Sequence, residues 1–358
     1  MGNPILIYGN IFSDRPERKA VPGAMKAIVC EEPRKVRLEI RPAPVPADGE
    51  VLIRIRRVGL CGTDYHIFTG EHPYLEYPRV MGHELAGVVE DPARTSLKRG
   101  QVVTVNPYLA CGSCIACRNG KPNCCVSIRV LGVHADGGMC ELLSVPAAAV
   151  IDASALTLEE AAMVEFLAIG AHAVSRSTPS PGNRVLVVGA GPIGVAAALF
   201  ARLDGASVTI LDVRRPRLEY ARARLGLDTV MGDERARAEL AARTDGEMFD
   251  CVFDATGNVR AMQSGLDYVA HGGTYVLLSV VKEDIAFPDP EFHKRETALL
   301  ASRNAVSADF ERVVSSIRGG MIRADSLLTH KFPAVEAPRR IPELIAAADG
   351  VLKAMVEF

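Results

Sequence analysis

Two patterns of apolar residues divide the chain. Between about residues 25 and 150, short apolar runs alternate with turns rich in proline and glycine, and these runs include KAIVC, EVLIRIRRV, LAGVVE and QVVTV. Runs of this length and composition are typical of β-strands, so we expect an all-β region. From about residue 183 the order becomes strand, glycine turn, helix and strand, which predicts a parallel sheet covered by helices.

The second region opens with one βαβ unit, RVLVVGAGPIGVAAALFARLDGASVTILD. Two further apolar runs, CVFDAT and TYVLLSV, extend the predicted parallel sheet and give an α/β fold class. After about residue 304 the pattern is mixed. We expect the last residues, LKAMVEF, to pair back with the first region.

Composition narrows the class of protein. A chain of 358 residues predicts two domains, and 48% hydrophobic with 23% charged residues is typical of a soluble globular protein. The formal net charge of -2 and the lack of a dense basic run argue against nucleic-acid binding. No stretch has the roughly 20 apolar residues that span a bilayer. The first residues, MGNPILIYGN, do not resemble a secretory signal, so we expect a cytoplasmic protein with reduced thiols.

The glycine turn predicts a dinucleotide site. GAGPIG follows a strand and opens a helix, where glycines allow a tight turn, close approach of the backbone to a pyrophosphate and close helix packing. Strand two ends at Asp212, placed to accept the hydroxyls of an adenosine ribose, which favours NAD over NADP. Arg214 and Arg215 follow and leave NADP open. The predicted cofactor residues are Gly189, Gly191, Pro192, Ile193, Gly194, Asp212 and Arg214.

A cysteine-rich stretch, CGSCIACRNGKPNCC, predicts a metal site. Two C-x-x-C steps and a further cysteine on a short loop match tetrahedral thiolate binding of zinc, and four protein ligands make such a site structural. An iron–sulfur cluster or a redox thiol pair are the alternatives. The chain supplies Cys111, Cys114, Cys117, Cys124 and Cys125.

Three other segments carry candidate ligands of an open metal site. GLCGTDYHIF contains Cys61, VMGHELAGVVE contains the adjacent His83 and Glu84, and MVEFLAIGAHAV contains Glu165. A thiolate, an imidazole and a carboxylate from separate loops form a three-ligand zinc site whose fourth position is free. Each residue alone is more typical of a packed core than of a metal site.

Taken together, these motifs resemble the zinc-dependent medium-chain alcohol and polyol dehydrogenases. The resemblance runs from Met25 onward and rests on GLCGTDYH, GHELAG, VVGAGPIG and the cysteine spacing. It implies a GroES-like, β-rich catalytic domain combined with a doubly wound Rossmann domain. It also implies a catalytic zinc on Cys61 and His83, completed by Glu84 or Glu165, and a structural zinc on Cys111, Cys114, Cys117 and Cys125.

The implied domains are an N-terminal extension (1–24), a catalytic domain (25–173 and 305–358) and an NAD-binding domain (174–304). The family resemblance also implies a homo-oligomer, a dimer or tetramer, and we expect GGTYVLLSV to supply an interface strand. The partners expected are a small-molecule substrate and further copies of the chain, with no nucleic acid and no membrane.

Within the family, the chain resembles the bacterial L-galactonate and L-gulonate 5-dehydrogenases through GVHADGG, DATGN, HGGTYV, DPEFHKRET and SRNA. The resemblance implies transfer of a hydride from a secondary hydroxyl of a sugar acid or polyol to NAD. The substrate carboxylate would need positive partners, and the candidates are His134, His293, Lys294 and Arg303. L-threonine 3-dehydrogenase, a sorbitol-type dehydrogenase and a non-catalytic nucleotide-binding relative are the alternatives.

The reaction also needs a path for a proton. Zinc lowers the pKa of a bound hydroxyl so that an alkoxide forms near neutral pH. Thr63, two residues after Cys61, is placed to take the proton and pass it toward His66. Asp64 is expected to orient neighbouring groups or to cap a turn.

Overall fold

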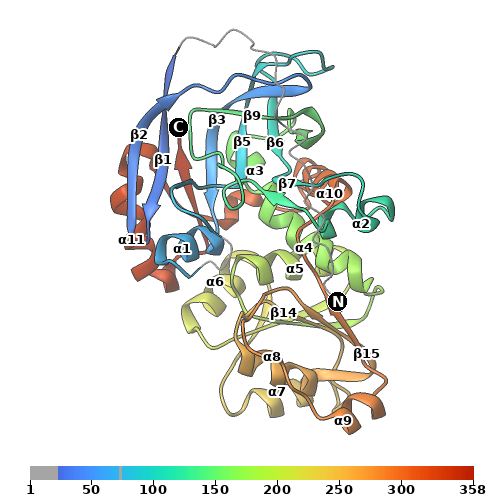
Figure 1. The fold of residues 1–358 in the computed structure, drawn as a ribbon. Helices are drawn as coiled ribbons and strands as arrows, with labels where there is room; N and C mark the ends of the chain where they lie inside the picture. The colour runs from blue at the N-terminus through green and yellow to red at the C-terminus, as the bar shows by residue number, and fades with distance from the viewer. Residues whose placement is uncertain (1–22, 72–74) are drawn as a thin grey trace, which may run out of the picture.

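The computed structural model describes residues 23–71 and 75–358. Residues 1–22 of the expected N-terminal extension lie outside the described residues. The described chain forms two regions stacked one above the other, and the β-rich region contains both the start of the described chain and its C-terminus (Figure 1).

The β-rich region holds the first group of predicted strands. A large mixed sheet has the order β10-β6-β5-β3-β18-β17, with β9 pairing to β3, and a smaller sheet has the order β2-β1-β4. KAIVC, EVLIRIRRV, LAGVVE and QVVTV fall in β1, β3, β5 and β6, which confirms them as strands. The bounds are β1 Ala24–Glu32, β2 Lys35–Pro42, β3 Glu50–Leu60, β4 Arg79–Val80, β5 Glu84–Asp91, β6 Val102–Val105, β9 Leu142–Pro146, β10 Val150–Asp152, β17 Leu328–Pro333 and β18 Lys353–Glu357.

The second region is built on a parallel sheet of six strands in the order β13-β12-β11-β14-β15-β16. Numbered within the region, this order is 3-2-1-4-5-6, the doubly wound order of dinucleotide-binding sheets. The predicted βαβ unit and parallel sheet are therefore confirmed. The bounds are β11 Arg184–Val188, β12 Ser207–Asp212, β13 Asp228–Met231, β14 Phe249–Asp254, β15 Val269–Leu277 and β16 Ala298–Ala301.

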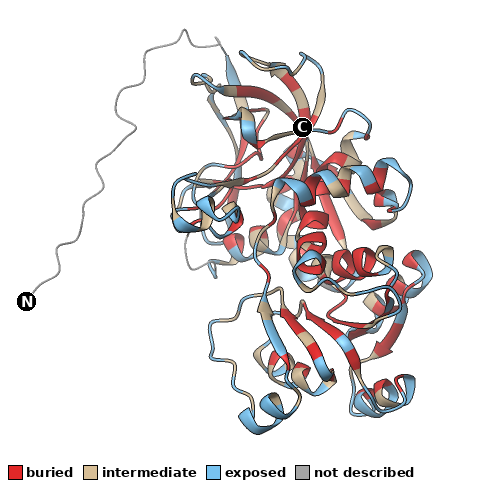
Figure 2. Ribbon diagram, turned by 90° about the vertical axis from the view of Figure 1, so that its right-hand side faces the viewer, coloured by how far each residue is buried: buried red, intermediate tan, exposed pale blue. Residues whose placement is uncertain are grey.

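Helices cover the parallel sheet and join the two regions. Figure 2 shows buried ribbon concentrated in the sheets and in the helices between the two regions. The bounds are α1 Gly62–Thr69, α2 Ile115–Arg118, α3 Leu158–Ala162, α4 Val164–Ser177, α5 Pro192–Leu203, α6 Arg215–Leu225, α7 Ala236–Arg243, α8 Val259–Gly265, α9 Asp289–Lys294, α10 Ser307–Arg318 and α11 Ala337–Ala346.

The close contact between α4 and α5 fixes the two regions relative to each other beside the candidate metal ligands and the glycine turn. Gly170 on α4 lies against α5, and a Cβ atom at this position would come within 2.5 Å of the Cβ of Ala196. Because α5 begins at the glycine turn and α4 carries Glu165, this packing holds the candidate metal ligand at a fixed place beside the candidate cofactor turn.

The C-terminal segment returns to the first region. β18 pairs with β3 in an antiparallel register, with Ala354 opposite Leu60, which confirms the pairing predicted for LKAMVEF. α4 runs through the boundary expected between residues 173 and 174, so that boundary stays a prediction.

The strand expected at an interface lies inside the parallel sheet and not at its edge. Most of GGTYVLLSV lies in β15, which is flanked by β14 and β16 and therefore has no free edge along the paired residues. In the described sheet the strand at this edge is β16, whose Ala298, Leu299 and Ala301 are exposed. Pairing with another copy requires free backbone groups, so any sheet-to-sheet interface at this edge would involve β16.

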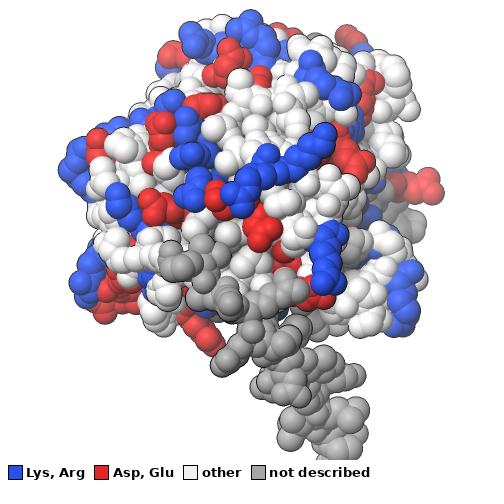
Figure 3. All heavy atoms as spheres, turned by 90° about the horizontal axis from the view of Figure 1, so that it is seen from above, with Lys and Arg blue, Asp and Glu red and all other residues white. Residues whose placement is uncertain are grey.

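The surface charge agrees with the small net charge. On the face seen in Figure 3, basic and acidic side chains are interspersed and do not form a field of one sign. Among the described residues, no helix combines the length and the apolar character required to cross a bilayer.

Candidate active site

Cys61 is held in place by the first turn of α1. It caps this helix with extended backbone, and its N–H donates to Oδ2 of Asp64 at 3.0 Å. The other carboxylate oxygen of Asp64 accepts the N–H of Gly82 at 3.2 Å. The fully buried Asp64 thus ties the Cys61 loop to the residue before His83, so it both caps a turn and orients neighbouring groups.

Glu84 lies at the start of β5, in a space that a glycine provides. Its partner on β3 is Gly59, and a Cβ atom there would lie 2.0 Å from a carboxylate oxygen of Glu84. Lys353 of β18 approaches from the other side, with Nζ 2.5 Å and 2.7 Å from the two oxygens. The Lys353 side chain is 1% exposed, and its Nζ lies 4.3 Å from the centre of the Phe166 ring. This buried pair fixes the Glu84 carboxylate.

Glu165 lies in the first turn of α4, close to the same residues. Its Oε1 accepts a short hydrogen bond from the hydroxyl of Tyr108. Burial raises the pKa of Glu165 to about 7, the Glu84 carboxylate adds to this rise, and His83 opposes it. Lys353 already pairs with Glu84, so Glu165 is the buried carboxylate whose charged form a bound cation at this place would stabilise.

The donor set fits a zinc ion. The ligand atoms of Cys61, His83 and Glu84 lie within 4.8 Å of one another, whereas Glu165 stands beside this group and not within it. Nδ1 of His83 is buried and has no hydrogen-bond partner in the described part of the chain. Burial disfavours the charged imidazole, yet Cys61 and Asp64 raise the pKa of His83 well above its usual range. Thiolate, imidazole and carboxylate ligands leave the fourth position of a tetrahedral zinc ion open.

The two predicted relay residues are less closely connected. The Thr63 hydroxyl lies 3.8 Å from the Cys61 sulfur, so it stands at the metal group. The His66 side chain is 62% exposed, and its Nδ1 lies 3.1 Å from Glu71. Within residues 23–71 and 75–358, no direct hydrogen bond joins Thr63 to His66. A proton that follows this path therefore has to cross solvent or substrate between the two side chains.

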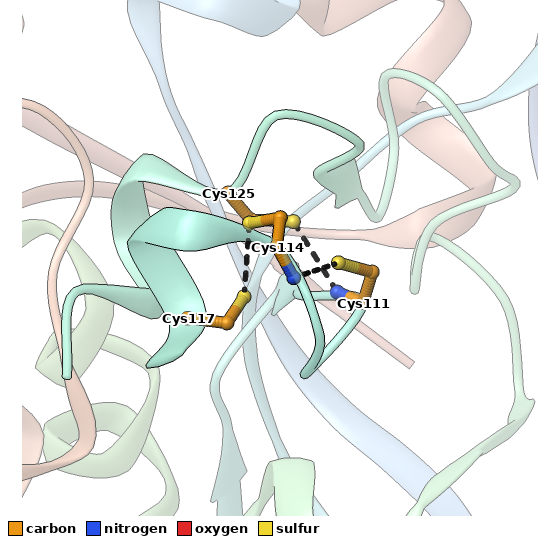
Figure 4. Close-up of side chains that lie close together, drawn as sticks. All are labelled: Cys111, Cys114, Cys117 and Cys125. Atoms are coloured by element: carbon orange, nitrogen blue, oxygen red, sulfur yellow. Dashed lines mark hydrogen bonds between the residues drawn. The ribbon is translucent and has the colours of Figure 1, made fainter. Parts of the chain in front are cut away.

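The cysteine-rich stretch forms a lobe in which four sulfur atoms converge (Figure 4). We call residues 111–125 the cysteine lobe. The sulfur atoms of four cysteines lie within 4.8 Å of one another, while Cys124 stays exposed outside this group. The Cys114 N–H donates to the Cys111 sulfur at 3.4 Å, and the Cys111 N–H donates to the Cys125 sulfur at 3.3 Å. The four are Cys111, Cys114, Cys117 and Cys125.

The chemistry of this lobe fits a closed zinc site. Hydrogen bonds from Ser113 and Cys114 lower the pKa of Cys111 to about 6, so this ligand readily becomes a thiolate. Burial and the adjacent Cys114 thiol raise the pKa of Cys117 to about 12, because further negative charge is unfavourable there. A bound divalent cation would stabilise all four cysteines as thiolates, including those whose pKa is raised without it.

The glycine turn borders a pocket of about 500 Å³ at the C-terminal edge of the parallel sheet. Gly189 and Gly191 line the pocket, whereas Gly194 lies below it, and a Cβ atom there would be 1.9 Å from the Gly189 carbonyl oxygen. Pro192 and Ile193 open α5 but, like Gly194, are not among the residues that line the pocket. The first turn of α5 has free backbone N–H groups, which are typical partners of phosphates. The positions of the three glycines are compatible with the predicted roles, which stay predictions.

Asp212 closes the adenosine end of this pocket. Its two carboxylate oxygens accept the N–H groups of Ala190 at 2.6 Å and Arg214 at 2.7 Å, so it braces the glycine turn from strand β12. The Arg214 guanidinium forms an ion pair with Asp349 at 2.9 Å. Asp212, Arg214 and Arg217 all line the pocket.

Comparison with known proteins agrees with this geometry. Residues 47–155 match the alcohol dehydrogenase GroES-like domain, and residues 192–318 match the zinc-binding dehydrogenase domain. The chain is 44% identical to L-galactonate-5-dehydrogenase of Escherichia coli K12 over 312 residues, which cover 86% of this chain and 92% of that protein.

The chain belongs to the zinc-binding alcohol dehydrogenase family. A second relative, the probable D-xylulose reductase A of Arthroderma otae, is 30% identical over an alignment that covers 90% of this chain and 98% of that protein. A crystal structure described as a short chain alcohol dehydrogenase (RspB) from Escherichia coli CFT073, complexed with NADH, superimposes with a TM-score of 0.87 at 29% identity. It covers 94% of this chain and 99% of that one.

As a zinc-binding alcohol dehydrogenase, the chain is an enzyme that combines a GroES-like domain with a dinucleotide-binding domain and uses zinc and NAD. Sequence reasoning missed two residues of this dehydrogenase site. Tyr108 opens the two-residue strand β7 (Tyr108–Leu109) in a stretch without a motif, and Lys353 lies 269 residues after its partner Glu84. The lysine in LKAMVEF was the available signal, because a lysine that precedes the apolar run at residues 354–356 and is itself buried needs a partner.

Proposed function

We propose that this dehydrogenase oxidises the C5 hydroxyl of a hexonate, L-galactonate or L-gulonate, and transfers the hydride to NAD. The observation that carries the proposal is the 44% identity to an L-galactonate-5-dehydrogenase along 92% of that protein. The open metal group and the dinucleotide pocket of this chain supply the parts that such a reaction requires.

We assign the site residues as follows. When bound, zinc supplies a Lewis acid that favours the alkoxide form of the substrate hydroxyl. Cys61 and His83 hold it, with Glu84 or Glu165 as the further ligand, and Asp64 keeps the two ligand loops together. Thr63 takes the hydroxyl proton, and the exposed His66 delivers it to solvent.

The structure narrows the candidates for binding the substrate carboxylate. Lys294 and His293 lie on α9, and Nζ of Lys294 is 3.7 Å from Glu291 of the same helix. Arg303 and His134 lie near each other. Burial lowers the pKa of His134 most, and the positive charge of Arg303 lowers it further. We assign the charge of the carboxylate to Arg303, because a guanidinium binds a carboxylate through two parallel hydrogen bonds. His134, whose lowered pKa favours the neutral imidazole, adds a hydrogen bond and no charge.

We also propose a cytoplasmic location and a homo-oligomer, a dimer or tetramer. The exposed edge of β16 supports the second part, because unpaired backbone groups on an edge strand are available for pairing with another copy.

A substrate panel tests the proposed function. NADH formation is followed by absorbance with L-galactonate, L-gulonate, sorbitol and L-threonine, each with NAD and with NADP. The proposal predicts turnover of a hexonate with NAD that exceeds turnover of sorbitol and threonine at least tenfold in kcat/KM. Turnover of L-threonine or sorbitol without turnover of either hexonate would reject it.

A further inference from the structure

A buried chain of polar side chains connects the cysteine lobe to both regions of the molecule. Asn123, in the lobe, contacts His172 on α4, which in turn contacts Asp309 on α10. The distances are 3.0 Å from Asn123 Nδ2 to His172 Nε2 and 2.8 Å from His172 Nδ1 to Asp309 Oδ2. All three residues are less than 10% exposed. The catalytic roles assigned above use none of these residues.

The hydrogen bonds of this chain are complementary. The Asn123 amide nitrogen can only donate, so His172 accepts at Nε2 and carries its hydrogen on Nδ1, which donates to Asp309. The second amide hydrogen of Asn123 goes to the carbonyl oxygen of Arg303 at 3.0 Å. Asp309 Oδ2 also accepts the N–H of Val306 at 2.9 Å. A buried network of complementary donors and acceptors holds its members in one arrangement.

The segment held by this network is the loop between β16 and α10, residues 302–306. Asn123 binds the loop twice, because the side chain of Asn304 also donates to the Asn123 carbonyl oxygen at 3.1 Å. Asn304 has a φ of 54°, a left-handed conformation that these contacts stabilise. In a parallel sheet, ligands bind beyond the C-terminal ends of the strands, and this loop directly follows the C-terminal end of β16.

The loop presents Arg303 toward the other region. Its guanidinium is exposed and, among the described residues, forms no hydrogen bond or ion pair. The neighbouring His134 belongs to a segment that packs on the metal centre, since a Cβ atom at Gly132 would lie 2.9 Å from the backbone of Gly82, next to His83. The loop therefore reaches from the cofactor sheet to the wall of the metal site.

We propose that Asn123 and His172 are positioning residues that fix the 302–306 loop, so that the cysteine lobe sets the affinity of the enzyme for an acidic substrate. The metal-holding lobe is then part of substrate recognition, and its role extends beyond stabilising the fold. Where it concerns substrate affinity, this inference rests on the proposed function.

The test uses Asn123→Asp, which keeps the size of the side chain and removes both donated hydrogen bonds. Asn119→Asp is the matched control, because Asn119 is an exposed asparagine in the same lobe. We expect hydrogen exchange at residues 302–306 to accelerate in Asn123→Asp alone. We also expect KM for the hexonate to rise about tenfold, because one hydrogen-bonding group that binds the substrate is misplaced. The kcat should stay within about twofold of wild type. Zinc content and NADH affinity should stay unchanged.

Three outcomes overturn parts of this account separately. Unchanged exchange at residues 302–306 in Asn123→Asp rejects the positioning role, whatever the substrate proves to be. Loss of one zinc per chain, with kcat and KM both changed, shows that Asn123 only supports the lobe and also rejects it. A wild-type enzyme that does not oxidise hexonates rejects the proposed function, while the exchange experiment still decides on the loop. If Asn123→Asp does not fold, Asn123→Ala replaces it in the same measurements.

Discussion

Asp212 shows how one side chain serves both the protein and its cofactor. It accepts hydrogen bonds from two backbone N–H groups at the glycine turn, and we propose that its negative charge disfavours a 2′-phosphate. The sequence predicts the second role, since an acidic residue at the end of strand two has a known partner. It does not predict the first role, which depends on how the two loops meet in space.

Asp212→Ser should therefore weaken the use of NAD and improve the use of NADP. We expect kcat/KM with NAD to fall about tenfold or more, because the contacts to the ribose are lost and the glycine turn is held less firmly. We expect kcat/KM with NADP to rise, because the repulsion between the Asp212 carboxylate and the 2′-phosphate is removed. Initial rates with both cofactors measure the change. Asp228→Asn, an exposed change at the start of β13, is the control, and an unchanged ratio between the cofactors in Asp212→Ser would refute the assignment.

Lys353 and Glu84 form a buried ion pair whose partners depend on each other. Lys353→Met should lower the free energy of unfolding by about 3–5 kcal/mol, because it leaves a buried carboxylate without its partner. The double variant Lys353→Met with Glu84→Gln should be more stable than Lys353→Met alone, since the uncompensated charge is gone. Urea unfolding of the three proteins measures both effects. Equal stability of the single and double variants would show that the pair is not coupled.

At the scale of elements, α3 is joined to the large sheet by an ionic cluster. Glu159 on α3 contacts Arg57 of β3 at 2.9 Å and Lys331 of β17 at 3.0 Å. Partial burial would raise the pKa of Glu159, but the two cations outweigh it and lower the pKa to about 2. A carboxylate whose pKa is lowered in the folded state stabilises the fold above its unfolded pKa.

Glu159→Gln should consequently cost about 1 kcal/mol at neutral pH, a value reduced for the solvent exposure of the cluster. The difference from wild type should persist down to about pH 5 and vanish as the pH falls toward 2, the pKa of the folded state. Unfolding free energies across this range measure it. Glu219→Gln on the exposed side of α6 should show no such dependence, and a difference for Glu159→Gln that is constant with pH would contradict the account.

Sequence patterns predict local elements better than the contacts between them. The strands and the βαβ unit were predictable because the periodicity of apolar residues and the glycine turns are local signals in the sequence. The convergence of four cysteines was predictable from spacing, since a short loop limits where each sulfur can lie. Tyr108 beside Glu165 was not, and neither was the chain from Asn123 to Asp309, because these contacts join segments brought together only by packing.

At the scale of the whole molecule, the proposed assembly of copies would use the β16 edge of the parallel sheet. β16 exposes Leu299 and an unpaired strand edge, whereas β15 is paired on both sides. Leu299→Lys should weaken the oligomer and increase the monomer fraction about tenfold at micromolar concentration, since charge on an edge strand opposes pairing. Light scattering after size exclusion measures this, with Val335→Lys as an exposed control; an unchanged mass distribution would place the interface elsewhere.

We propose that this enzyme holds one metal in a closed cysteine site and another in an open site beside the bound nicotinamide. Zinc content per chain, measured by mass spectrometry of the metal, tests it most directly. The account predicts two zinc ions per chain in the wild-type enzyme and one in the Cys61→Ala, His83→Ala double variant, which should still bind NADH. A wild-type enzyme with a single zinc, or a double variant that keeps two, would contradict it.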